Sequence, residues 1–272
     1  MTMLVVGVVL IAGVSTRSSS PPSGALVGGD LHSLVVDPAN PQRLFVGGHQ
    51  AVSTSSDGGR SWQPVPSLAN ADAMGWAFTD DAVWVSGHPG LSRSVDGGRT
   101  FQRHNEGLPD TDVHAFGAGA GAIYGASPSV GMFASTDGGR SWPVRSPGAG
   151  QGFFGRILVN PADKDHVVAA DARGGVVESS DGGRAWRRLG GPPAVAWLSR
   201  GGTGMEALLA SGPQGAARSD DAGRTWTPLE LPGGALLVEA GPTPGLLYAA
   251  GHEGESAVVW VSRDGGRTWA RP

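Results

Sequence analysis

Short apolar stretches alternate along the chain with turns rich in glycine, serine, aspartate and proline. In the first such set, "HSLVVDP" (32–38) and "RLFVGGH" (43–49) flank the turn-forming "DPANPQ", and "AVSTS" follows at 51–55. Short segments of this kind, bounded by turn residues, are typical of β-strands. A glycine-rich turn then leads to a fourth strand that begins at Trp62. The pattern predicts an antiparallel meander of four strands, here named A to D.

The turn between strands C and D is repeated. "SSDGGRSW" at 55–62 recurs as "SVDGGRTF", "STDGGRSW", "SSDGGRAW", "SDDAGRTW" and "SRDGGRTW". The aspartates are Asp57, Asp96, Asp137, Asp181, Asp221 and Asp264, with spacings of 39, 41, 44, 40 and 43 residues. A period near forty with strand-like segments is the mark of a propeller with one four-stranded blade per repeat. We therefore predict an all-β, six-bladed β-propeller of antiparallel blades over residues 28–272, in which residues 24–29 can complete the sixth blade.

The chemistry of the repeated turn explains why it recurs. An aspartate in a tight turn accepts neighbouring backbone N–H groups, and glycine adopts positive φ without steric cost. The serine or threonine hydroxyl adds a local hydrogen bond, and the aromatic residue buries a large ring where the next strand begins. Phe101 takes the aromatic position in the second repeat, and Ala185 replaces the hydroxyl residue in the fourth. We interpret the six aspartates as structural.

Composition narrows the possible functions. Glycine (46 residues) and proline (20) are frequent, and only 16% of residues are charged, which suits short strands and tight turns. The net charge of −4 gives no basic field for nucleic acid. The chain has no cysteine, which excludes disulfides, thiolate metal sites and a cysteine nucleophile.

Residues 1–27 differ from the rest of the chain. An apolar run from Leu4 to Val14 precedes the Ser/Pro-rich "STRSSSPPSG". The run is shorter than the roughly 20 residues of a membrane-spanning helix but suits the apolar core of a signal peptide. No lysine or arginine precedes the run, which is unusual for a signal peptide. We predict a signal peptide or weak anchor followed by a spacer, and an exported, extracellular or envelope-associated protein.

The repeated turn resembles the Asp-box, or bacterial neuraminidase (BNR) repeat, of sialidases, some endoglucanases, sortilin-type receptors and photosystem assembly factors. The elements "HSLVVDP", "MGWAF", "GHPG" and "VHAF" also resemble exported bacterial propellers labelled glycosyl hydrolase or exo-alpha-sialidase. The resemblance implies the propeller fold. It leaves the function open because these relatives perform unrelated tasks.

Histidines collect at the end of the blades opposite the Asp-boxes. In a meander, the A–B and C–D turns share one end, whereas the B–C turns and the connections between blades share the other. Of seven histidines, only His104 and His166 fall elsewhere. The aligned residues at this end, in blades that adjoin around the ring, are His32, His49, Met74, His88, His114 and His252.

Imidazole and thioether groups are borderline to soft ligands. We predict that the six residues bind a transition metal ion, copper ahead of zinc or nickel, in one or two subsites, with no nucleotide or organic cofactor. Asp30, Asp72 and Asp112 each lie two residues before a candidate ligand and can accept the second ring N–H of a ligating histidine. Asp72 can do so only for a histidine of a neighbouring blade. The protein is expected to be a monomer that binds a metal ion or small ligand at this rim.

Two other functions stay open. The first is a sialidase-like glycoside hydrolase or carbohydrate-binding propeller. Such an enzyme uses three arginines and a tyrosine nucleophile, but Tyr124 and Tyr248 fall at core positions, and only Arg156 and Arg173 are candidate arginines. A pair from Asp30, Asp72 and Asp112 could act in glycoside hydrolysis if about 5 Å apart. The second is a scaffold that binds a protein partner. The sequence favours a non-catalytic role over an enzyme.

Overall fold

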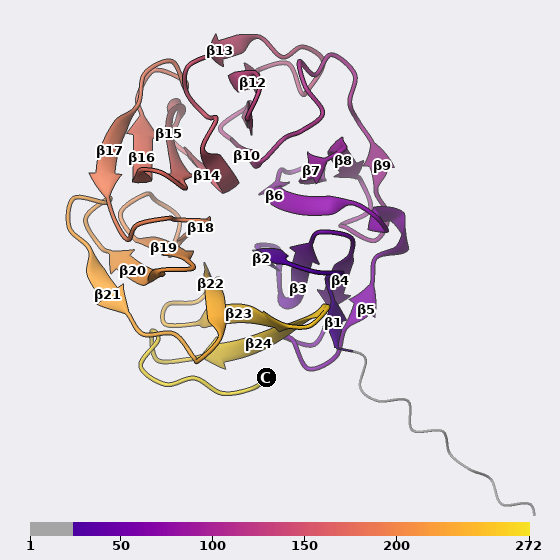
Figure 1. Cartoon of the computed structure of the whole chain (residues 1–272), viewed down its shortest axis with the longest axis vertical. Coiled ribbons are helices and arrows are strands. Elements are labelled where there is room, and N and C mark those ends of the chain that lie inside the picture. Colours follow the sequence, from indigo (N-terminus) through magenta and orange to yellow (C-terminus); the bar gives the residue numbers. More distant parts are fainter. Residues whose placement is uncertain (1–23) are drawn as a thin grey trace, which may run out of the picture.

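The computed structural model describes residues 24–272, so the predicted signal segment lies outside the described residues. Its strands radiate around a central axis, with β2, β6, β10, β14, β18 and β22 innermost (Figure 1). Within the described range the helical structure is a single 3-10 turn, η1 (Pro66–Leu68). The prediction of an all-β propeller is confirmed. None of the described residues forms a helix long and apolar enough to cross a membrane.

Five repeats fold as the predicted four-stranded meander, and the sixth supplies three strands of a sheet that β1 completes; each repeat is called a unit below. The first unit contains β2 (Leu31–Asp37), β3 (Asn40–Gly48), β4 (Val52–Ser55) and β5 (Gln63–Pro64). The second contains β6 (Asp72–Phe78), β7 (Val83–His88), β8 (Gly90–Ser94) and β9 (Gln102–Arg103). The third contains β10 (Ala115–Gly119), β11 (Ala122–Ser127), β12 (Gly131–Ser135) and β13 (Val144–Ser146).

The remaining units follow the same order. The fourth contains β14 (Phe153–Asn160), β15 (Asp163–Asp171), β16 (Gly175–Ser179) and β17 (Arg187–Gly190). The fifth contains β18 (Trp197–Arg200), β19 (Leu208–Gly212), β20 (Gly215–Ser219) and β21 (Thr227–Leu229). The sixth contains β22 (Ala235–Ala240), β23 (Leu247–Glu253) and β24 (Ser256–Ser262).

One pairing joins two units into a single sheet. The inner strands β10 and β14 pair in parallel, with Ala115 opposite Gly155 and Phe116 opposite Arg156. The third and fourth units thereby form an eight-stranded sheet beside four sheets of four strands. The number of independent blades consequently stays a prediction.

The first strand of the described chain closes the ring. β1 (Ala25–Leu26) pairs antiparallel with β24, with Ala25 opposite Ala257. The N–H of Val27 then donates to Glu255 O at 2.9 Å, while Val27 O accepts N–H groups of Gln50 and Ala51 from the first unit. The expectation that residues 24–29 complete the last unit agrees with this pairing, and the propeller begins before the boundary that we placed at residue 28.

Large side chains fill the space between neighbouring sheets. Phe45 of the first unit packs against Trp76 of the second, with ring centroids 5.0 Å apart, and both side chains are fully buried. Trp84 and Phe116 make the equivalent contact between the second and third units at 6.3 Å. Burial of these rings supplies much of the apolar stabilisation between units. The ends of the sheets are thus left to turns and connections.

The six Asp-boxes form closely similar hydrogen-bonded turns, and the fourth lacks one bond because Ala185 has no hydroxyl. In the third box, Asp137 Oδ1 accepts the N–H of Ser141 at 3.0 Å, and Oδ2 accepts the Ser141 hydroxyl at 2.5 Å. A buried serine two residues before the aspartate, here Ser135, accepts the N–H of Gly139 at 2.8 Å. The equivalent serines of the other boxes accept the same bond from Gly59, Gly98, Gly183, Gly223 and Gly266. We call this end of the sheets the box end and the opposite end the histidine end.

Candidate functional site

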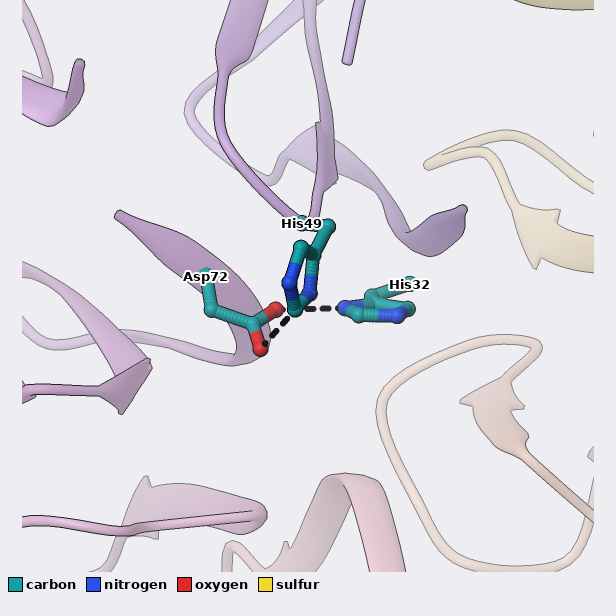
Figure 2. Close-up of side chains that lie close together, drawn as sticks. All are labelled: His32, His49 and Asp72. Atoms are coloured by element: carbon teal, nitrogen blue, oxygen red, sulfur yellow. Dashed lines mark hydrogen bonds and ion pairs between the residues drawn. The ribbon is translucent and has the colours of Figure 1, made fainter. Parts of the chain in front are cut away.

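His32, His49 and Asp72 come together at the histidine end (Figure 2). Nδ1 of His32 lies 2.5 Å from Oδ1 of Asp72, and Nδ1 of His49 lies 3.4 Å from Oδ2. The two imidazole rings meet edge to face with centroids 6.0 Å apart. One potential ligand atom from each residue lies within 4.8 Å of the other two. We call these three residues the His–His–Asp group.

Local backbone irregularity places the two histidines. The register between β2 and β3 shifts between Leu31 and Ser33, so His32 occupies a β-bulge. A bulge redirects a side chain relative to the regular strand, and here it turns the His32 ring towards the second unit. His49 lies in the turn after β3, where its N–H donates to Asp30 O at 3.2 Å. The chain that closes the ring therefore also holds the His49 turn.

The group is buried at one side and open at the other. The Asp72 side chain is 9% exposed and that of His32 is 15% exposed, whereas the His49 side chain is 60% exposed. A buried carboxylate is costly unless it is paired, and the two imidazoles supply partners for both of its oxygens. The open side at His49 gives solvent and solutes direct access to the group.

The spacing suits a metal ion. Four ligand atoms around an ion with bonds of 2.0–2.1 Å lie roughly 3.3 Å apart in a tetrahedral site. The distance from His49 to Asp72 already matches this value, and the shorter contact from His32 to Asp72 needs only a small opening. Asp72 contacts a histidine of the neighbouring unit, which its position in the repeat predicts. In addition, its carboxylate offers a ligand atom of its own.

The other predicted ligands lie outside the His–His–Asp group. His88 is exposed and pairs directly with Asp72 across β6 and β7. Paired residues of antiparallel strands point to the same face with Cβ atoms roughly 5 Å apart, so His88 lies beside the group. Met74 occupies the bulge of β6 that corresponds to His32 of β2, but it is buried, with 6% exposure. His252 lies exposed in β23 of the sixth unit.

His114 forms a separate pair. Its Nε2 lies 3.0 Å from Oδ1 of Asp112, as the spacing of the two residues predicts. The ring of Phe154, from β14, stands between this pair and the His–His–Asp group, with centroids 5.5 Å from His32 and 6.0 Å from His114. Sequence reasoning missed Phe154. The only signal was its place in "FFGR", where two adjacent aromatic residues of a strand must face opposite sides.

The histidine end carries more carboxylates than arginines. This end consists of the B–C turns, the connections between units and the strand residues that border them. Two arginines lie in these segments, Arg103 and Arg173. The carboxylates of the same segments that lie at this end are Asp30, Asp72, Asp110, Asp112, Asp171, Glu230, Glu253 and Glu255. Such an excess of negative charge raises the local concentration of cations.

Arg156 and the two tyrosines are engaged elsewhere. Arg156 Nη1 lies 2.8 Å from Oε1 of buried Glu239, and Trp197 Nε1 donates to Oε2 at 3.0 Å. Burial raises the pKa of the Glu239 carboxyl, and the charge of Arg156 opposes that rise. These contacts tie the fourth, fifth and sixth units together near the axis. Tyr124 and Tyr248 are buried in the core, as predicted.

Comparison with known proteins identifies the repeat. The family model for the BNR/Asp-box repeat matches residues 260–271, which include the sixth box. The chain carries a BNR/Asp-box repeat. Its other five boxes have closely similar sequences, and each keeps the hydrogen bond from a glycine N–H to the buried serine that the matched one makes. Among curated proteins, no sequence matches this chain.

Solved structures share the propeller fold of this chain. The GH74 xyloglucanase from Xanthomonas campestris superposes with a TM-score of 0.60 at 17% identity, over 92% of this chain and 46% of that one. The GH74 enzyme from Niastella koreensis gives a TM-score of 0.63 at 13% identity, over 91% and 46%. The chain thus spans about half the length of these two enzymes. YCF48 from Cyanidioschyzon merolae gives 0.53 at 19% identity, over 93% and 86%.

Proposed function

We propose that this propeller is an exported, non-catalytic protein that binds a transition metal ion at the His–His–Asp group. The observation that carries the proposal is the convergence of His32, His49 and Asp72, with one potential ligand atom each within 4.8 Å of the others. The residues come from two units: His32 from β2, His49 from the turn after β3, and Asp72 from β6. The deep carboxylate is held by imidazoles, while the open side admits an ion from solution.

Copper(II) is the proposed ion. Two imidazoles and a carboxylate form a nitrogen and oxygen donor set, for which affinity among divalent ions rises to copper and falls at zinc. Zinc and nickel are the alternatives. Binding replaces the hydrogen bond between His32 and Asp72 with bonds to the ion. His88 is the candidate fourth ligand because it pairs with Asp72 across the sheet and is exposed.

The test is metal analysis of the full chain, expressed with its own N-terminal segment and purified without a histidine tag. Elemental analysis of the purified protein, followed by titration with copper(II), zinc and nickel, should give one tightly bound copper ion. His49→Ala should weaken copper binding strongly and leave the melting temperature of the metal-free protein unchanged. His104→Gln, at a histidine stacked on Trp84 away from the group, is the matched control and should retain full binding.

The alternatives make different predictions. A glycan-binding or glycoside-hydrolysing propeller would bind oligosaccharides in the presence of a chelator, and a protein scaffold would retain its partner under the same conditions. Absence of copper binding at micromolar concentration, together with chelator-insensitive glycan binding, would replace the metal proposal with the carbohydrate one. Because the GH74 neighbours share less than a fifth of their residues with this chain, they support the fold and not a substrate.

A further inference from the structure

The turns between strands A and B differ in length around the ring. In the first four units they comprise residues 38–39, 79–82, 120–121 and 161–162, whereas in the fifth and sixth they comprise residues 201–207 and 241–246. The two long turns belong to neighbouring units, whose strands β19 and β22 are in contact (Figure 1). Both turns line one cavity of about 370 Å³ at the box end, which we call the A–B cavity.

Backbone hydrogen bonds and burial hold the long turn of the fifth unit. The N–H of Gly201 donates to Ala207 O at 3.0 Å, which closes the turn on itself. Glu206 O accepts the N–H of Ala222, from the fifth box, at 2.8 Å. Met205 anchors the turn in the core, with 5% exposure.

The long turn of the sixth unit is held in a similar way. The N–H of Gly241 donates to Leu246 O at 2.8 Å, and Gly245 O accepts the N–H of Gly265, from the sixth box, at 2.9 Å. Both walls of the A–B cavity are therefore fixed before any ligand binds, which lowers the entropic cost of binding.

The walls of the A–B cavity are mostly apolar. They include Leu208, Leu209, Pro242, Pro244 and Leu246. The fold does not impose this composition, because the corresponding cavity between the first and second units is lined by Arg43 and Arg99 together with serine and threonine side chains. Cavities of roughly 300–1,000 Å³ with apolar walls and few polar groups are typical binding sites for small organic molecules.

One ion pair supplies the charged groups of the A–B cavity. Nε of Arg218 donates to both carboxylate oxygens of Asp220, at 2.9 and 3.0 Å, and Nη2 of Arg218 lies 2.8 Å from Oδ1. The exposed fractions of the two side chains, 48% and 61%, place the pair at the mouth of the cavity. No acceptor in the described residues binds Nη1 of Arg218, which lies beside Gly265 of the cavity wall. The pair thus offers no net charge, but it keeps an N–H donor for an acceptor atom.

We propose that the A–B cavity binds a small uncharged carbonyl compound with an apolar body. The carbonyl oxygen accepts an N–H from Nη1 of Arg218, and the apolar body displaces water from the leucine and proline walls. A charged ligand would lose hydration without gaining a counter-charge, because Arg218 and Asp220 already neutralise each other. This binding function does not rest on the proposed metal site, which lies at the opposite end of the sheets.

The experiment uses the full chain in the presence of a chelator, so that the metal site takes no part. The probe is the neutral ketone 6-propionyl-2-(dimethylamino)naphthalene, whose fluorescence shifts to shorter wavelength in apolar surroundings. A matched analogue with a CH2 group in place of the C=O is measured by competition. The ketone should bind saturably, with one molecule per chain.

Substitution of the ion pair tests the carbonyl contact. Arg218→Met removes the donor and should weaken ketone binding about five- to tenfold, the value of one hydrogen bond, while the affinity of the analogue changes by less than about twofold. Asp220→Asn keeps the guanidinium and is the matched control, in which the ratio of the two affinities should be unchanged. An equal effect of Arg218→Met on ketone and analogue would overturn the carbonyl contact, and with it the class of ligand.

Filling the cavity tests the place of binding. Ala207→Phe puts a large side chain into the cavity and should abolish saturable binding of both probes, whereas Ala207→Ser preserves the space and the binding. Thr243→Phe narrows the mouth from an exposed position and should cause the same loss without touching the core. Ketone binding that never saturates, or that survives both phenylalanine substitutions, would overturn the cavity as a binding site.

Discussion

The two ends of the sheets are built on opposite plans. At the box end, all six turns use the same serine, aspartate and second glycine positions, and only the fourth lacks the hydroxyl bond to the aspartate. At the histidine end, the B–C turns read "GHQA", "GHPG", "SPSV", "ARGG", "PQGA" and "HEGE", and each makes different contacts. Both ends meet the same need to reverse an antiparallel strand. The difference teaches that repetition marks what the fold requires, whereas divergence leaves room for a site.

The largest expected effect is on metal binding. Replacing His32 and His49 together with alanine removes two of the three potential ligands, so copper affinity of the folded protein should fall by more than about 100-fold. The metal-free protein should also lose some stability, because the buried Asp72 carboxylate loses both imidazole partners. Copper titration and thermal unfolding of the same preparation check both statements. Unchanged copper stoichiometry would show that the His–His–Asp group is not the copper site.

The second prediction concerns a box-end substitution that should lower stability without changing copper binding. Ser135→Ala leaves the N–H of Gly139 without its buried acceptor, which should cost about 1–3 kcal/mol of unfolding free energy. Copper affinity of the folded protein should be unchanged. Urea unfolding with and without copper measures both. Ser129→Ala, at an exposed turn serine of the histidine end of the same unit, is the comparison variant.

Strong acid should weaken the box end. The Ser61 hydroxyl and N–H hold the pKa of Asp57 at about 2, and Thr225 and Thr268 hold the pKa values of Asp221 and Asp264 at about 2 in the same way. Because these values lie below the ordinary 3.8, the carboxylates contribute their full stabilisation above about pH 4. That contribution is lost as the pH falls towards about 2.

Urea midpoints measured in steps from pH 5 to pH 2 test this window. A midpoint that stays constant between pH 4 and pH 2 would show that the box carboxylates are not the acid-sensitive groups. The Asp57→Asn variant should lose less stability across the window than the wild type, because its amide does not titrate.

The smallest effect concerns the one irregular box. Ala185 supplies its N–H to Asp181 at 2.9 Å but has no hydroxyl for the second carboxylate oxygen. Ala185→Thr restores the hydroxyl of the other boxes and should stabilise the fold by about 0.5 kcal/mol, the lower range for a hydrogen bond. A small rise in melting temperature checks it. A fall would indicate that the fourth turn differs from the others in shape.

The sequence predicts the box end far better than the histidine end, for a physical reason. The hydrogen bonds of a box turn join residues only a few positions apart, so a short stretch of sequence specifies them. The His–His–Asp group depends on a bulge at His32 and on the fit between two units, which no local pattern specifies. Counting aligned positions treated Met74 as equivalent to His32, yet the Met74 side chain is buried. The position of Phe154 required knowledge of where β14 shifts register.

The pairing of β1 with β24 constrains the order in which the molecule can form. Every other antiparallel strand pair in the described residues joins strands that are consecutive in sequence, whereas Ala25 pairs with the distant Ala257. During synthesis from the N-terminus, residues 25–26 stay without their partner until the sixth unit has emerged. Contacts between distant residues slow folding. Closure of the ring must therefore await the sixth unit, and the segment that supports the turn carrying His49 becomes paired on both sides only then.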